Sequence, residues 1–210
     1  MTDKPWLAIP AGDYEGHMGT AGVDQLGPLR AILADAYGQI RPARLAVLGC
    51  GTGNGLDVVD PAHTQRFVGV DLNPDYVALA RQRQARLAGV AEWICADAAT
   101  CALDPAGFDL IHAALLFEYV DPAAIVPRIA GWLAPGGVLS VVLQLPGGEA
   151  PISETGFESL QSLSALMALV PPERFRDLAT RAGLTETSSR RIPLSRGKAF
   201  WAATFAAPRR

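Results

Sequence analysis

A short apolar run that breaks into regularly spaced glycines constrains the fold of this chain most. Residues 45–48 are Leu-Ala-Val-Leu, which predicts a buried strand, and glycine then occupies every second position from Gly49 to Gly55. Glycine has no Cβ, so such a loop can adopt positive φ angles and lets a ligand approach the backbone closely. A strand, a glycine turn and a helix start therefore predict a ligand pocket at the carboxyl end of a parallel strand.

The second and third predicted strands each end in an acidic residue. Asp71 follows the apolar run at residues 67–70, and Asp97 follows the strand predicted at residues 92–96. A carboxylate at the first position can accept hydrogen bonds from both hydroxyls of a ribose. The pair of features indicates a nucleoside-cofactor site.

Strand and helix patterns alternate through the first two thirds of the chain. This alternation predicts a parallel sheet covered by helices on both faces, and the last two strands, joined by a short polar turn, predict an antiparallel hairpin. Residues 1 to about 22 predict no regular structure, because prolines and glycines interrupt any periodicity. Predicted helices span residues 26–40, 74–88, 122–133, 157–170 and 173–182, with a short one ending near Pro61; predicted strands span 45–48, 67–71, 92–96, 108–113, 138–145, 185–194 and 199–206.

Composition excludes several classes of protein. With 210 residues, a net charge of −3 and no basic excess, the chain fits one domain and lacks the positive face typical of a nucleic-acid binder. No signal-like leader and no apolar run of membrane-spanning length occurs, so no membrane partner is expected. The three cysteines form no pairs and predict free thiols in the cytoplasm, with Cys50 and Cys95 buried. The spacing of the histidines predicts no metal site.

Five motifs, taken in order, resemble the class I (seven-stranded, Rossmann-like) S-adenosylmethionine-dependent methyltransferases. They lie at residues 48–53, 69–73, 95–98, 108–113 and 133–139. The resemblance implies an α/β three-layer sandwich with a mostly parallel seven-stranded sheet of order 3-2-1-4-5-7-6, whose last strand is antiparallel. A single domain over residues 1–210 is expected, with residues 1–25 as an amino-terminal lid and residues 147–171 as a substrate cover.

The resemblance also implies a cofactor, S-adenosyl-L-methionine, and assigns residues to it. Asp71 would accept from the ribose hydroxyls with Leu72 against the adenine, and Asp97 would accept from the adenine amino group. The Ala98 backbone NH would reach a ring nitrogen. The full set of implied cofactor-binding residues is Tyr14, Gly49, Cys50, Gly51, Gly53, Asn54, Asp71, Leu72, Asp97, Ala98 and Ala113.

One position departs from the family pattern. The family usually carries Asp or Glu two residues before the first glycine of the loop, and Val47 stands there. That carboxylate generally helps to hold the loop and the charged end of the cofactor. Its absence would lower the affinity for the cofactor unless another acidic side chain replaces it, and Asp13, Glu15 and Glu118 are the candidates.

Three residues around the fourth strand are the candidate catalytic groups. His112, Glu118 and Tyr119 lie where the family often places groups that contact the substrate. A buried histidine bonded to the backbone remains an equal interpretation for His112, and an ordinary loop edge remains one for the other two. Tyr14 and His17 could fold over the cofactor as part of the lid, and a frayed terminus is the alternative.

The expected function is transfer of a methyl group to a small-molecule acceptor. Positioning of the acceptor in line with the methyl group is the main requirement, with at most one general base. The region after the fourth strand lacks the motif typical of enzymes that methylate nucleic-acid or protein amines, and only Glu118 and Asp121 offer carboxylates there, so no metal is predicted. Two alternatives stay open: a cofactor-binding domain without catalysis that acts as a regulator, and a nucleotide-dependent oxidoreductase. The acceptor atom and the oligomeric state are not determined by the sequence.

Overall fold

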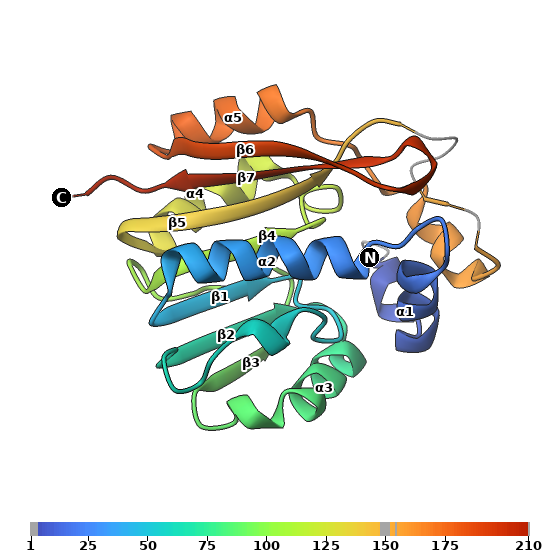
Figure 1. Ribbon diagram of the computed structural model, residues 1–210, viewed down its shortest axis with the longest axis horizontal. Helices are drawn as coiled ribbons and strands as arrows, with labels where there is room; N and C mark the ends of the chain where they lie inside the picture. Colours follow the sequence, from blue (N-terminus) through green and yellow to red (C-terminus); the bar gives the residue numbers. More distant parts are fainter. Residues whose placement is uncertain (1–3, 148–151, 154, 210) are drawn as a thin grey trace.

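The computed structural model describes residues 4–147, 152–153 and 155–209. Seven strands form one sheet, flanked by helices (Figure 1). The strands are β1 (Arg44–Leu48), β2 (Arg66–Asp71), β3 (Ala91–Cys95), β4 (Phe108–Ala114), β5 (Leu133–Gln144), β6 (Thr185–Pro193) and β7 (Ala199–Ala206). The helices are α1 (Ala11–Gly19), α2 (Leu26–Ile40), α3 (Pro74–Arg83), α4 (Pro122–Trp132) and α5 (Pro172–Arg181).

The strand order is β3-β2-β1-β4-β5-β7-β6. Strands β1 to β5 pair in parallel, whereas β7 runs antiparallel to both β5 and β6. The predicted fold class, the strand order and the antiparallel last strand are therefore confirmed. Because the parallel strands end at the same edge, the loops that follow β1, β2, β3 and β4 come together there.

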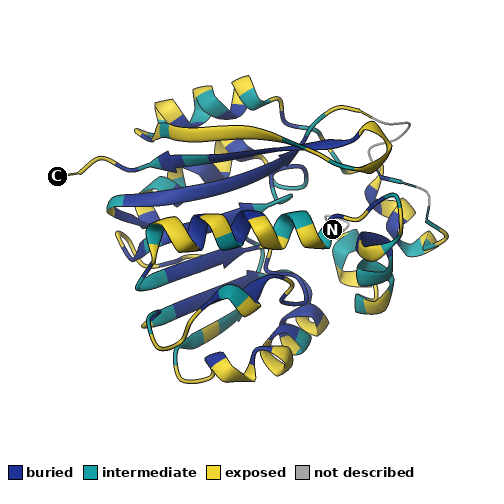
Figure 2. Cartoon of the chain, viewed as in Figure 1, coloured by how far each residue is buried: buried dark blue, intermediate teal, exposed yellow. Residues whose placement is uncertain are grey.

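Two apolar clusters hold the three layers together. On one face, α2 buries Leu33 and Tyr37 against Leu45 and Phe67 of the sheet. On the other face, α4 and α5 cover a larger cluster that includes Phe175. Figure 2 shows the consequence, since the central strands are buried along their length and each helix exposes its outer side. Fully buried strands are expected where a parallel sheet has helices on both faces.

Two of the predicted helix starts are confirmed in atomic detail. The side chain of Asn73 accepts hydrogen bonds from the backbone NH groups of Asp75 and Tyr76 at the start of α3, and Asp121 accepts one from Ala123 at the start of α4. Both helices also have proline in their first turn, as expected from its fixed φ and missing NH. Asp24, an acidic residue just before α2, does not cap that helix, because Gln25 occupies the cap position and makes no side-chain cap bond.

The amino-terminal prediction of irregular structure is wrong. The 3₁₀ turn η1 (Pro5–Ala8) and the helix α1 occupy this region, despite the glycines in α1. Tertiary packing stabilises α1, since its His17 and Met18 are buried. Gly16 is required there, because a Cβ at this position would overlap the ring of Phe157.

The helix predicted at residues 157–170 is also wrong. Only a 3₁₀ helix, η4 (Glu158–Leu163), forms, followed by turns. The three leucines Leu160, Leu163 and Leu166 recur every third residue, which matches the 3.0-residue period of a 3₁₀ helix. Leu160 and Leu163 pack in a separate cluster with Ile9 rather than on the sheet.

Smaller deviations follow from local geometry. The helix predicted at residues 74–88 ends at Arg83 and continues as the 3₁₀ turn η3 (Ala85–Leu87), and the short helix after the glycine loop is only the 3₁₀ turn η2 (Leu56–Val58). Cys50 is buried as predicted, but Cys95 is exposed, because β3 is an edge strand.

Candidate functional site

A cavity of about 260 Å³ opens at the carboxyl-terminal edge of the parallel strands. Its walls come from the glycine loop, from the ends of β2, β3 and β4, and from two segments outside the sheet: residues 4–29, and 152–167 apart from residue 154. Of the predicted site residues, the structure brings together on this cavity Tyr14, Gly49, Gly51, Asp71, Leu72, Asp97, Ala98 and Tyr119.

The glycine loop is held tightly against the end of β2. The NH groups of Gly49 and Cys50 both donate to the carbonyl oxygen of Val70, at 2.9 and 3.0 Å. The next glycine, Gly51, donates its NH to Asp71 Oδ2 at 2.8 Å. All four glycines of the loop have positive φ, as the sequence predicted. Gly49 and Gly51 line the cavity, and a Cβ on Gly51 would narrow it, since that atom would approach the Tyr14 hydroxyl to 3.4 Å.

Asp71 lies where a carboxylate can hold both the loop and a ligand. Its second oxygen accepts the NH of Asn73 at 3.0 Å. Burial raises the pKa of Asp71, and the backbone NH donors of Asn73 and Gly51 oppose that shift. Each carboxylate oxygen has a further acceptor site, so the two backbone bonds orient Asp71 and leave capacity for hydroxyl donors.

Asp97 is joined to the amino terminus of the chain. Its Oδ2 accepts a hydrogen bond from Lys4 Nζ at 2.9 Å, and its other oxygen accepts the NH of Ala99. Burial disfavours ionisation of Asp97, but these donors outweigh it and lower its pKa. The carboxylate is therefore charged at neutral pH and fixed in direction.

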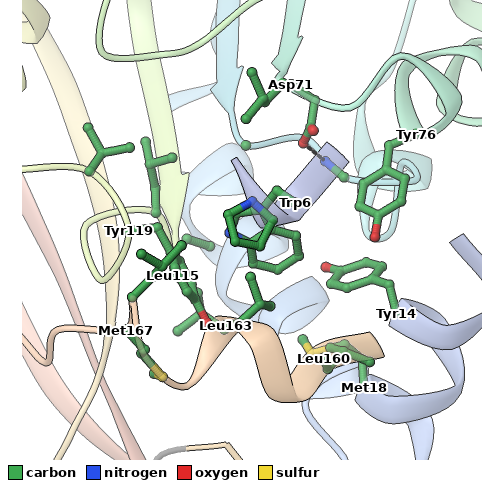
Figure 3. Close-up of a pocket in the computed structure, with 18 of the residues that line it drawn as sticks. Trp6, Tyr14, Met18, Asp71, Tyr76, Leu115, Tyr119, Leu160, Leu163 and Met167 are labelled. Carbon is green, nitrogen blue, oxygen red and sulfur yellow. Dashed lines mark hydrogen bonds between the residues drawn. The ribbon is translucent and has the colours of Figure 1, made fainter. Parts of the chain in front are cut away.

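Aromatic rings from three parts of the chain meet inside the cavity (Figure 3). Trp6 of η1 packs edge-to-face on Tyr119, with ring centroids 5.0 Å apart, and on Tyr14, at 6.1 Å. Tyr14 in turn lies 5.3 Å from Tyr76 of α3. The amide of Asn73 fixes Trp6 by donating to its carbonyl oxygen at 2.8 Å. The segment before α2 is therefore part of the cavity wall.

Apolar side chains form the wall opposite the acidic residues. Leu160, Leu163 and Met167 come from the segment around η4, and Leu115 comes from the end of β4 (Figure 3). Leu115 has a positive φ of 52°, an unfavourable conformation for a side chain of this size. Part of the predicted 147–171 cover, residues 148–151 and 154, lies outside the described residues.

Several predicted site residues do not line the cavity. Cys50, Gly53 and Ala113 are turned into the packing of the fold, and the Asn54 amide donates to the Leu26 carbonyl oxygen. Gly53 instead allows a close approach to Ala80 of α3. Side chains alternate along a strand, so Ala113 points into the core beneath α4 and α5 while Ala114 reaches the cavity.

Two candidate catalytic residues are likewise set back from the cavity. His112 is buried on the α2 side of the sheet, where its Nδ1 lies 3.0 Å from Ser140 Oγ, and burial lowers its pKa to about 4. Glu118 is 1% exposed, and its Oε1 accepts the Gln144 backbone NH at 2.6 Å. Burial raises the pKa of Glu118 to about 7, and its Oε2 has no hydrogen-bond partner in the part of the chain that the structure describes. Only Tyr119 of the three faces the cavity.

Val47 is buried in β1 and packs in the cluster beneath α2. Of the acidic candidates for its replacement, Glu15 contacts the glycine loop: its carboxylate accepts from Thr52 Oγ1 and pairs with Arg83. Asp13 instead accepts from Ser159.

Sequence reasoning missed much of the wall, including Lys4, Trp6, Gln25, Tyr76 and Lys198. Trp6 could have been found from the sequence, since a tryptophan in a glycine- and proline-rich stretch indicates that the stretch packs against the rest of the protein. The others come from segments whose approach depends on the tertiary fold. Within the described ranges, no cluster of three or more metal-ligating side chains occurs, and no helix has the length and apolarity to cross a bilayer.

Comparison with known proteins bears on this geometry. A family model described as a methyltransferase domain matches residues 46–141. A trans-aconitate 2-methyltransferase of Methylobacterium radiotolerans is 41% identical over 106 residues, which are 49% of this chain but 38% of that protein. The match thus spans about two fifths of the relative's length.

Solved structures share the fold. The N-methyltransferase NodS from Bradyrhizobium japonicum, crystallised with S-adenosyl-L-homocysteine, aligns with a TM-score of 0.67 at 20% identity, over 88% of this chain and 87% of that one. The [4+2]-cyclase SpnF aligns with a TM-score of 0.64 at 16% identity, over 80% and 76%. Neighbours with such different names show that the fold alone does not determine the reaction. The family model nevertheless spans the five ordered motifs, so over residues 46–141 this chain is similar to methyltransferase domains, and its sheet has the strand order expected from that resemblance.

Proposed function

We propose that this protein transfers the methyl group of S-adenosylmethionine to a small-molecule acceptor. One observation carries the proposal: the carboxylate of Asp71 fixes the glycine loop through the Gly51 NH while it lines the same cavity as Asp97. The cavity thus has Asp71, which can bind hydroxyls, the backbone of the loop glycines, which have no side chains, and a second carboxylate on Asp97. This arrangement fits the ribose, the methionine part and the adenine amino group of a single nucleoside.

The residues of this chain act mainly by positioning. When bound, S-adenosylmethionine supplies a methyl group that its sulfonium already activates. Asp71, Asp97 and the loop backbone would orient it, and the aromatic and apolar walls would exclude water and align the acceptor. Tyr119 is the predicted catalytic residue that faces the cavity. The roles of His112 and Glu118 would be indirect, because both are packed behind the wall.

Binding of S-adenosylhomocysteine and of NAD, measured by calorimetry, tests the cofactor. We expect the first to bind and the second not to, and Asp71→Ala to abolish binding. Asp75→Ala is the matched control, since Asp75 is exposed on α3 and its side chain makes no hydrogen bond among the described residues. Binding of NAD alone would favour an oxidoreductase. Binding of S-adenosylhomocysteine without turnover of any acceptor in a broad panel would favour a regulatory domain.

A further inference from the structure

The cavity has a buried polar group that the cofactor assignment does not use. Gln25, which precedes α2, is 4% exposed and lines the cavity, and its side-chain amide makes no hydrogen bond with the described residues. Because Gln25 lines the cavity, its amide is available to bond with a polar group of a bound ligand.

A cationic group lies on the same side of the site. The backbone NH of Gln25 donates to Met18 O, beside His17 of α1. His17 and Lys198 both line the cavity, and burial followed by the nearby Lys198 charge lowers the pKa of His17. Lys198, 5% exposed, donates to Ser153 Oγ at 2.8 Å. An amide and an ammonium group thus both line the cavity, and neither bonds to Asp97, whose partner is Lys4.

The space next to these groups is apolar. Leu29, Leu115, Leu163 and Met167 line it, and none of the described lining residues is an arginine. An ion with three carboxylates, such as trans-aconitate, would have to lose its hydration with few charged partners to replace it. One carboxylate with an apolar body matches the single cationic end and the apolar wall.

The chemistry of the walls also favours a carboxylate over a hydroxyl. A hydroxyl acceptor must lose a proton during transfer, whereas an ionised carboxylate does not. Of the groups predicted to serve as a base, His112 and Glu118 do not line the cavity, whereas Tyr119 does; His17 also lines it, with its Nδ1 held 2.7 Å from Thr155 Oγ1. A carboxylate oxygen attacks the methyl carbon as the bond from that carbon to sulfur breaks. The bonding electron pair stays on sulfur, and the products are a methyl ester and S-adenosylhomocysteine, with no proton transferred.

We propose, on the basis of the methyltransferase function above, that the acceptor is a monocarboxylic acid with an apolar body, whose carboxylate is bound by Gln25 and Lys198. The acid lies along Leu115, Leu163 and Met167. Gln25 and Lys198 therefore determine the head group, and the segment around η4 determines the body.

Turnover of octanoate, octanol and trans-aconitate tests the class of acceptor. Octanoate is expected to have a kcat/KM at least tenfold above that of trans-aconitate, and octanol is expected not to react. Shortening the acid should raise KM about fourfold per methylene, the equivalent of about 0.8 kcal/mol. A preference for trans-aconitate, or turnover of octanol instead of octanoate, overturns the proposal.

Variants separate this proposal from the cofactor assignment. Gln25→Met should raise the KM for octanoate about tenfold and leave the Kd of S-adenosylhomocysteine within twofold, whereas Gln161→Met, on the exposed side of η4, should change neither. Lys198→Gln provides a second variant if the first is unstable in a thermal melt. Equal weakening of cofactor and octanoate in either variant assigns these residues to the cofactor and overturns the proposal.

Calorimetry distinguishes failure of the proposed function from failure of the proposed acceptor class. No binding of S-adenosylhomocysteine by the unmodified protein refutes the proposed function itself. Binding of S-adenosylhomocysteine with neither binding nor turnover of octanoate refutes the acceptor class alone.

Discussion

The carboxylate of Glu15 in α1 accepts a 2.5 Å hydrogen bond from the hydroxyl of Thr52 in the glycine loop. The same carboxylate pairs with Arg83 of α3, whose guanidinium also donates to the Thr52 carbonyl oxygen. Two residues outside the sheet, Glu15 and Arg83, thereby hold the glycine loop at Thr52. Val47, the position before the loop where an acidic residue is expected, has no group that could do so. We therefore propose Glu15, among the three acidic candidates, as the residue that holds the loop in place of a carboxylate at position 47.

Removing that carboxylate should loosen the cofactor site. Glu15→Gln is expected to raise the Kd of S-adenosylhomocysteine about fivefold to tenfold, because a charge-assisted hydrogen bond contributes roughly 1.5 kcal/mol. Glu173→Gln, an exposed change on α5, is the control. Thr52→Val should weaken binding similarly, and the double variant should be no worse than either single one. Independent, additive losses in calorimetry would show that the two residues do not act through one clamp.

Asn73 joins the start of α3 to the amino-terminal segment. Its oxygen caps α3, and its amide nitrogen donates to the carbonyl oxygens of Trp6 and Ile9. Asn73→Ala should cost about 1–2 kcal/mol of unfolding free energy and expose the segment before α1 to protease.

Asp121→Ala removes a helix cap of the same kind from α4, without any bond to the amino terminus. It should lower stability without accelerating cleavage near Trp6. Limited proteolysis followed by mass spectrometry distinguishes the two variants, and equal cleavage rates would contradict the role given to the Asn73 amide.

Two glycines should respond oppositely to alanine. Gly38 lies inside α2, and no atom lies within 4 Å of the place that a Cβ would occupy, so Gly38→Ala should stabilise the protein by about 0.5–1 kcal/mol. Gly53 has a φ of +87°, and its Cβ would come within 3.2 Å of Ala80. Gly53→Ala should therefore destabilise by about 1–3 kcal/mol. Urea unfolding of both variants measures whether the free energy of unfolding rises for Gly38→Ala and falls for Gly53→Ala.

Glu118 should make stability depend on pH. Its pKa of about 7 in the folded protein lies above the ordinary value of 4.5, because the side chain is buried. Between these values the folded state keeps a proton that the unfolded chain releases, so the free energy of unfolding falls as pH rises and levels off above pH 7. The loss is on the order of 3 kcal/mol.

Glu118→Gln removes this titration. Denaturant unfolding at pH 5 and pH 8 should show a smaller loss of stability in the variant than in the unmodified protein. An identical pH dependence in both proteins would mean that Glu118 is ionised in the fold.

The part of the cavity wall at the sheet edge could be predicted because its residues are local to strand ends. Gly49, Gly51, Asp71 and Asp97 each follow an apolar strand within a residue or two, and parallel strands bring such positions to one edge. The same logic predicted Ala113 one residue too early. The alternation of side chains along β4 directs His112 and Ala113 to opposite faces, and neither reaches the cavity.

The remaining wall could not be predicted, because it depends on contacts between distant segments. Lys4 reaches Asp97 across 93 positions, and Gly16 of α1 lies under Phe157. The segment around η4 consists mostly of good helix formers, yet its leucines recur every third residue and pack with Ile9 instead of forming the α-helix that its apolar stripe suggested. In each case tertiary packing determined the structure, and no window of sequence contains that information.

The cavity wall is built partly from the sheet edge and partly from segments outside the sheet, and this division affects how the protein can evolve. Residues 46–141, which carry the matching family model, supply the carboxylates and the glycine loop, whereas the apolar wall comes mainly from residues on either side of them. Under the proposed function, substitutions in those flanks would change which acceptor is bound and leave the residues proposed to bind the cofactor unchanged. A descendant of this chain would then acquire a new acceptor by changing only its two flanks.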